Sequence, residues 1–167
     1  WENPKHYKSS IAAQDDTSAL IERQLDSLNY KVALNWEGTA TVSEKKAHYF
    51  LVEPIGDQIA LTCTFADTEL KENNTTETIF KNSATAWGTY WSDGGIVDFS
   101  GSTDPRANEL ERRVVLSQYL TKAQTAGKMP PQETGLTYNS WYGKPHLEMH
   151  WWHGVHYALW GRPQYLK

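Results

Sequence analysis

The chain has 167 residues, of which 39% are hydrophobic and 22% charged, with a formal net charge of −4 and a mean hydropathy of −0.65. This length is enough for one domain with its own core, or for parts of two domains. The composition excludes a nucleic-acid partner, because phosphate binding needs a clustered excess of Lys and Arg that the sequence lacks. No apolar run approaches the roughly 18 to 20 residues that cross a bilayer, so we expect no segment within a membrane.

The first half of the sequence predicts β-structure, most clearly between Leu28 and Trp36. Tyr30, Val32, Leu34 and Trp36 alternate with other residues in the period of two that a half-buried strand shows. The preceding segment is also predicted as a strand, Ala19–Leu25. A helix over Ala19–Leu28 is the alternative, because leucines recur there at helical spacing.

A turn at Glu37 and Gly38 is expected after this strand. Three more strands are predicted beyond it, the first two joined by a charged link at Ser43–Lys46: Thr39–Val42, His48–Val52 and Gln58–Phe65. In the last of these, alternate apolar residues share one face: Ile59, Leu61, Cys63 and Phe65. We expect Cys63 to be a small buried hydrophobic residue, and a lone cysteine excludes an internal disulfide.

Three helices are predicted in the second half. From Thr75 the apolar residues recur at spacings of three and four, which predicts a helix over Glu77–Trp91, followed by Gly94 and Gly95. The second helix is expected to begin with Thr103 or Asp104 as N-cap and Pro105 in the first turn, and to end at Gly127. A loop over Lys128–Lys144 leads to the third helix, which begins at Pro145 and ends at Arg162 and Pro163.

The polar segment Asp67–Asn74 has no apolar periodicity and forms the natural boundary within the chain. We therefore divide the sequence into a β-sandwich portion at residues 1–74, a linker helix at residues 75–97 and a helical portion at residues 98–167. The last helix is apolar on most of its faces and needs neighbours on several sides, so we expect the chain to be part of a longer protein.

Residues 130–160 hold four of the eight tryptophans, four of the six histidines and two carboxylates. Flat rings beside acids, imidazoles and a lysine are what a protein uses to bind a sugar, since aromatic faces cover its C–H face and polar groups bond its hydroxyls. The candidate sugar-binding residues are Trp141, Lys144, His146, Glu148, His150 and Trp151, with Glu133 as a secondary candidate.

The carboxylate of Glu148 is the most informative of these groups. A charged carboxylate among tryptophans is costly unless it is paired, which makes Glu148 a candidate for ligand contact or proton transfer. Glu133 and Lys144 serve equally well to cap a helix or hold a turn. The histidines could instead bond backbone or carboxylate groups inside an aromatic core.

A metal site is the other use that histidines at this spacing suggest. His146 and His150 are four residues apart, as in zinc hydrolases of the HExxH type, but Leu147 stands where that signature has glutamate. We therefore expect no metal and no cofactor.

The run ERRVVLSQYLTKAQTAGKMPPQETGLTYNSWYGKPHLEMHWWHGVHYALWGRP, within Asp98–Pro163, resembles the opening of the catalytic barrel of bacterial six-hairpin, (α/α)6 glycosidases. These enzymes are distantly related to the maltose and kojibiose phosphorylase group, and the barrel follows a large N-terminal β-sandwich and a linker helix. The resemblance implies an α+β fold, in which an antiparallel β-sandwich portion precedes a linker helix and the first helical hairpin of an (α/α)6 barrel.

The resemblance also implies a function. It places Glu148 where the family has a sugar-binding carboxylate, with His146, His150 and Trp151 nearby, although the family's phenylalanine-tryptophan-aspartate run is replaced by His146, Leu147 and Glu148. The family's general acid comes from a later hairpin, so this segment supplies sugar-binding residues to a glycoside hydrolase. Its expected partners are an oligosaccharide or polysaccharide and the remainder of the barrel. The alternative is a non-catalytic carbohydrate-binding or structural module.

Overall fold

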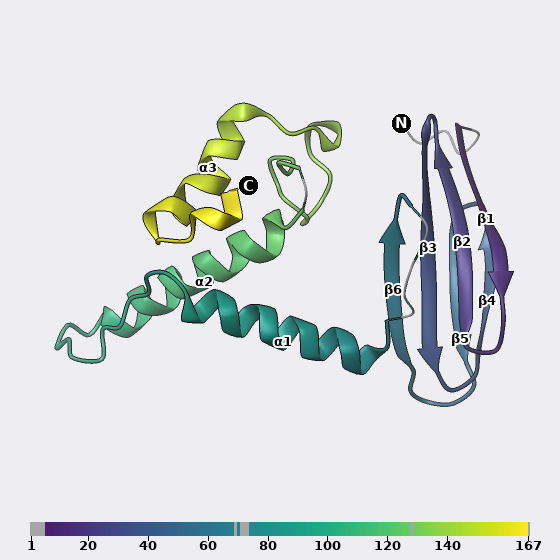
Figure 1. Ribbon diagram of the computed structural model, residues 1–167, viewed down its shortest axis with the longest axis horizontal. Coiled ribbons are helices and arrows are strands. Elements are labelled where there is room, and N and C mark those ends of the chain that lie inside the picture. Colours follow the sequence, from purple (N-terminus) through teal and green to yellow (C-terminus); the bar gives the residue numbers. More distant parts are fainter. Residues whose placement is uncertain (1–5, 69, 71–73, 128, 167) are drawn as a thin grey trace. The chain divides into compact units, whose positions relative to one another are not determined.

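The computed structural model describes residues 6–68, 70, 74–127 and 129–166. In these residues the chain is a mixed α+β protein with six strands in two antiparallel sheets and three α-helices (Figure 1). The expected α+β class is therefore confirmed, while the barrel and the three-part division of the chain stay predictions. Two compact units are present, residues 1–85 and 86–167.

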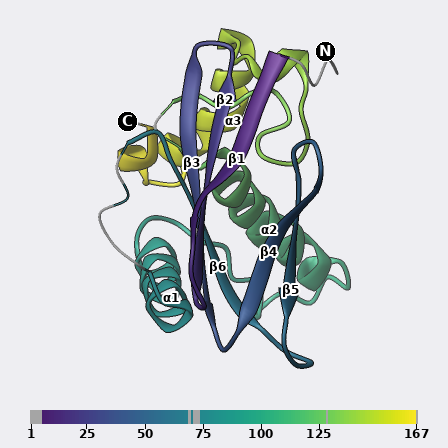
Figure 2. The same cartoon turned by 90° about the vertical axis from the view of Figure 1, so that its right-hand side faces the viewer.

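The first unit contains both sheets. Four strands form the larger sheet in the order β1-β2-β3-β6: β1 (Tyr7–Gln14), β2 (Ser18–Leu25), β3 (Leu28–Glu37) and β6 (Ala60–Ala66). Two strands form a hairpin beside it, as Figure 2 shows: β4 (Ala40–Lys46) and β5 (Tyr49–Pro54). The helix alternative for residues 19–28 is wrong, because β2 pairs with β3 along its whole length.

The hairpin and the larger sheet share one hydrophobic core. Its buried residues come from β2, β3 and β4: Ala19, Ile21, Val32, Leu34, Trp36, Ala40 and Val42. The alternation predicted for β3 is thus confirmed, since Val32, Leu34 and Trp36 all face this core. The indole N–H of Trp36 donates to the carbonyl oxygen of Asp16 at 2.9 Å, so its one polar group is satisfied.

Two strands differ from the prediction. β1 was not expected at all, because Lys8, Ser9 and Ser10 make this edge strand polar. The predicted link at Ser43–Lys46 is instead the second half of β4. It extends as strand because its polar side chains reach β5, where the Lys45 ammonium lies 2.9 Å from the Glu53 carboxylate.

The expectation of a buried Cys63 is wrong. Leu61, Cys63 and Phe65 pair with Trp36, Leu34 and Val32 of β3 and therefore share the core face of the sheet. All three are nevertheless exposed, because the core cluster does not extend over β6. The opposite face of β6 carries the buried Thr62, whose hydroxyl donates to the carbonyl oxygen of Asn74 at 3.1 Å.

The helices are α1 (Thr76–Ser92), α2 (Ala107–Thr125) and α3 (Leu147–Leu159), with short 3-10 helices η2 (Trp141–Gly143) and η3 (Pro163–Leu166). The boundary between the two compact units falls within α1. Helix α2 begins later than predicted, with Arg106 as its N-cap. The Asp104 carboxylate accepts a hydrogen bond from the N–H of Arg106 at 2.8 Å, and therefore bonds the residue before the helix and no N–H within it. Helix α3 begins at Leu147, not Pro145, with an extended His146 as its N-cap. No helix within the described ranges is long and apolar enough to cross a membrane.

The second unit is built around an aromatic cluster that encloses a cation. Tyr90 and Arg162 are both 0% exposed. The Arg162 guanidinium donates to the carbonyl oxygens of Tyr90 and Gly95, each at 3.1 Å, and to Oε1 of Gln118 at 3.0 Å. Its central carbon lies 4.5 Å from the centre of the Tyr90 ring, within cation–π range. No carboxylate in the described part of the chain pairs with it.

Candidate functional site

Helix α3 separates two cavities of the second unit. Because side chains three and four positions apart share a helical face, its sequence divides into distinct sides. One side lines a cavity with His150, His153, Gly154 and Tyr157. Another side lines a second cavity with Trp152, His156 and Trp160.

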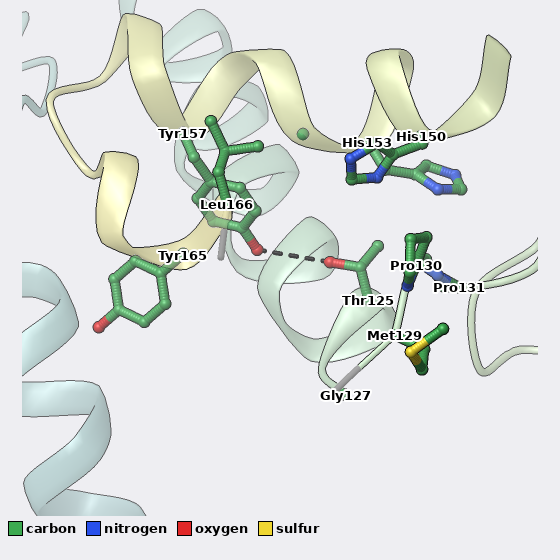
Figure 3. Close-up of a pocket in the computed structure, with 11 residues that line it drawn as sticks. Thr125, Gly127, Met129, Pro130, Pro131, His150, His153, Tyr157, Tyr165 and Leu166 are labelled. Atoms are coloured by element: carbon green, nitrogen blue, oxygen red, sulfur yellow. Dashed lines mark hydrogen bonds between the residues drawn. The ribbon is translucent and has the colours of Figure 1, made fainter. Parts of the chain in front are cut away.

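The first cavity, which we call the histidine pocket, has a volume of about 160 Å³ (Figure 3). Its walls come from the end of α2, the following loop, α3 and η3: Thr125, Gly127, Met129, Pro130, Pro131, His150, His153, Gly154, Tyr157, Tyr165 and Leu166. The Thr125 and Tyr157 hydroxyls lie 3.4 Å apart, and the Nδ1 atom of His153 is buried without a partner in the described residues. The pocket is therefore mostly apolar, with two imidazoles on one wall.

The second cavity, which we call the α2–α3 groove, has a volume of about 330 Å³. Its walls come from α2, from α3 and from the residue that directly follows α3: Arg113, Val114, Ser117, Gln118, Thr121, Trp152, His156 and Trp160. The Trp152 side chain is largely exposed, at 62%. The groove thus combines two indole rings with a row of polar side chains along α2.

The polar side chains of α2 are arranged to accept hydrogen bonds. The Ser117 hydroxyl donates to the carbonyl oxygen of Arg113 at 2.8 Å, and the Thr121 hydroxyl donates to that of Ser117 at 2.9 Å. Each hydroxyl donates its hydrogen to a backbone carbonyl oxygen of the helix, so its oxygen lone pairs can accept a hydrogen bond from another group. The hydroxyl groups of a ligand are suitable donors.

His156 is neutral at neutral pH. Burial lowers the pKa of its imidazole, and the positive charge of Arg162 lowers it further. Its Nε2 atom is buried and has no partner in the part of the chain that the structure describes. A neutral imidazole here acts as a hydrogen-bonding group and contributes no charge to the groove.

Four of the predicted sugar-binding residues lie on exposed surface outside both cavities: Trp141, Lys144, Glu148 and Trp151. Trp141 belongs to η2, and Glu148 lies in the first turn of α3. Trp151 lies beside the groove residue Trp152 in sequence but on another side of the helix. The exposed carboxylate of Glu148 has no hydrogen-bond or ion-pair partner among the described residues.

The other three predicted residues have defined neighbours. The Nε2 atom of His146 lies 3.8 Å from a carboxylate oxygen of Glu133, an ion pair when the imidazole is protonated. His150 lies in the histidine pocket beside His153 (Figure 3). His146 is the extended N-cap of α3, so it lies outside the helix that carries these two histidines.

The sequence interpretation missed the residues of the α2–α3 groove. Trp152, His156 and Trp160 recur every four positions, which is a signal for one face of a helix. The matching stripe on α2, Val114, Ser117 and Thr121, was visible in the same way. What the sequence did not reveal is that the two stripes face each other.

Among its described lining residues, neither cavity carries the pair of carboxylates that glycoside hydrolysis uses. Among their described lining residues there is no Asp or Glu. Likewise, the described residues contain no cluster of three or more His, Cys, Asp or Glu that could hold a metal ion. The rings, imidazoles and hydroxyls that line the two cavities are suited to aromatic and hydrogen-bonding contacts with a ligand.

Comparison with known proteins does not add to this geometry: no protein-family model, curated protein or solved structure matches the chain. The resemblance of residues 98–163 to six-hairpin glycosidases therefore stays a prediction.

Proposed function

We propose that the second unit binds a saccharide in the α2–α3 groove, and that the protein to which it belongs hydrolyses glycosidic bonds with this segment supplying sugar-binding residues. The observation that carries the proposal is the pairing of Trp152 and Trp160 with the polar side chains of α2 in one groove. Carbohydrates are bound by this combination, because the rings cover the apolar face of the sugar while polar groups select its hydroxyls.

Exposed indoles support the same reading. Trp141, Trp151 and Trp152 are all more than half exposed on the second unit. An indole buries about 150 to 250 Å² when covered, and each Å² of apolar surface removed from water contributes about 25 cal/mol. Because these rings are already partly covered and a ligand covers one face of each, the gain is about 1 to 2 kcal/mol per ring.

The hydrolytic part of the proposal comes from the resemblance. Since no described carboxylate lines either cavity, the general acid and base must come from outside them. This agrees with the implied family, in which a later hairpin provides the acid. The same lack of lining carboxylates favours the second candidate function, a carbohydrate-binding module without chemistry.

The test is calorimetry on the full chain with a panel of oligosaccharides, beside an assay for released sugar. We expect binding of at least one glycan, and we expect Trp152→Ala to weaken it tenfold or more. Phe65→Ala is the matched control, because it removes an exposed aromatic ring from the first unit. It should leave the affinity unchanged.

Two outcomes separate the candidates. Binding with product, from the chain or from a longer protein that contains it, supports hydrolysis, whereas binding without product in both supports the module. Absence of binding to every glycan, or a Trp152→Ala affinity equal to that of the parent chain, contradicts the proposal.

A further inference from the structure

The second unit differs from the first in charge. Residues 86–167 contain eight Lys and Arg against seven Asp and Glu, whereas residues 1–85 contain eight against thirteen. The unit that carries the groove therefore has a formal charge of +1 in a chain of −4. Within the groove the contrast is stronger, because its lining includes Arg113 and, in the described residues, no acidic side chain.

Arg113 is only partly neutralised by its carboxylate partner. Its Nε atom donates to Glu109 at 2.7 Å, but the same carboxylate also accepts two bonds from Arg112, at 2.8 and 3.0 Å. One negative charge is thus shared by two guanidinium groups. These bonds lower the pKa of Glu109 to about 2, so its carboxylate stays ionised and the local excess remains one positive charge at neutral pH.

The terminal nitrogens of Arg113 are available for a ligand. Among the described residues its guanidinium donates through Nε alone, and its side chain is 72% exposed. Arginine presents its nitrogens in a planar fork that matches the two oxygens of a carboxylate or sulfate. A fork with two unused nitrogens at the rim of an aromatic groove is suited to such a group.

A second cation lies directly beneath the groove. The fully buried Arg162 donates to Oε1 of Gln118, and Gln118 is itself a lining residue. Because Arg162 has no carboxylate partner among the described residues, its charge is not cancelled locally, and low surrounding polarity reduces screening. The groove floor therefore has a positive potential that does not depend on surface side chains.

We propose that the α2–α3 groove binds an acidic saccharide, with a carboxylate or sulfate group of the sugar held by the Arg113 guanidinium. This inference rests on the proposed function and specifies its ligand. The sugar ring stacks on Trp152, and the hydroxyls of Ser117 and Thr121 accept hydrogen bonds from its hydroxyl groups.

The experiment uses three oligosaccharides of equal length with the full chain: an oligogalacturonate, a sulfated oligosaccharide and a neutral maltooligosaccharide. We expect at least one acidic ligand to bind tenfold or more tightly than the neutral one at low salt. This preference should disappear as the salt concentration approaches about 1 M, where the screening length falls to about 3 Å. The first two ligands distinguish carboxylate from sulfate recognition.

Arg113→Gln provides the residue-level test, and Arg112→Gln is its matched control. Each variant removes one of the two positive charges that pair with the Glu109 carboxylate, but only Arg113 lines the groove. We expect Arg113→Gln to weaken acidic-ligand binding about tenfold while Arg112→Gln changes it less than threefold. Arg113→Lys should recover only part of the affinity, because it keeps the charge and loses the fork.

The two proposals fail differently. If the neutral ligand binds as tightly as both acidic ones and Trp152→Ala still abolishes binding, saccharide binding stands and the acidic preference is overturned. Equal losses for Arg113→Gln and Arg112→Gln also overturn it. If none of the three ligands nor any other glycan binds, the proposed function itself is wrong.

Discussion

A fully buried guanidinium, that of Arg162, organises the second unit. It satisfies two backbone carbonyls and one side-chain amide from three different segments, at Tyr90, Gly95 and Gln118. Its Nη2 atom has no partner in the described residues. A buried cation without a counter-ion is costly, and here hydrogen bonds and the face of Tyr90 offset that cost.

Arg162→Met should lower the free energy of unfolding of the second unit by about 2 kcal/mol. The substitution removes the guanidinium and its desolvation cost, but leaves the carbonyl oxygens of Tyr90 and Gly95 and Oε1 of Gln118 without this donor. Urea denaturation followed by tryptophan fluorescence measures the change. Arg106→Met is the control and should lower the free energy of unfolding much less than Arg162→Met does, because Arg106 makes an exposed ion pair with Asp104. Equal costs for both variants would contradict this role.

At the scale of elements, the ends of α1 and α3 meet through glycines. Gly94 has a left-handed backbone with φ of 73°, and a Cβ atom there would lie 2.4 Å from the carbonyl oxygen of Trp160. The next residue, Gly95, donates its N–H to that same oxygen at 2.6 Å. The close approach fixes Trp160 and Arg162, and so positions one end of the α2–α3 groove.

Gly94→Ala should destabilise the second unit by about 2 kcal/mol or more, because the alanine adopts a left-handed conformation and its methyl group collides with backbone. Gly101→Ala is the control, since a Cβ at Gly101 meets nothing within 4 Å. Thermal unfolding of the two variants measures the difference. A Gly94→Ala melting temperature no lower than that of Gly101→Ala would refute the packing argument.

The strands show which elements local pattern can predict. The residues of β3 alternate because one face packs against the hairpin, so Val32, Leu34 and Trp36 were identified correctly. β1 lies at a sheet edge, where polar side chains are tolerated and no alternation is needed. On β6 the shared face of Leu61, Cys63 and Phe65 is confirmed, but its exposure depends on how far the hairpin extends, which no local pattern contains.

The candidate site, like the strands, could be predicted from the sequence only in part. The enrichment of aromatic and imidazole groups in residues 130–160 is visible in the sequence, and the structure draws His150, Trp152, His156 and Trp160 of this window into two cavities. Arg113 and Gln118 of α2 lie more than thirty residues before these four residues in the sequence. Their place beside α3 results from tertiary packing around Arg162, so composition within one window could not reveal them.

At the scale of the whole molecule, each compact unit has its own core. The first is aliphatic with one indole, Trp36, and the second is the aromatic cluster around Tyr90 and Arg162. Separate cores allow separate cooperative transitions.

We expect urea unfolding to give two transitions. Fluorescence reports mainly on the second unit, because six of the eight tryptophans lie in residues 86–167, whereas far-UV circular dichroism also follows the strands. The two probes should therefore give curves that do not coincide, and Arg162→Met should shift the fluorescence transition while the strand transition in the circular dichroism curve stays in place. Coincident curves that both move in the variant would mean that the chain unfolds as one unit.

The uncovered side of β6 has a practical consequence for handling the protein. An outermost strand offers unused amide and carbonyl groups, and here they run alongside Leu61, Cys63 and Phe65 on an open surface. Such a sheet edge can pair with strands from neighbouring molecules, and oxidation of the accessible Cys63 thiol can join two molecules by a disulfide. We therefore expect cross-linked aggregates to form first in concentrated stocks that are kept without reductant.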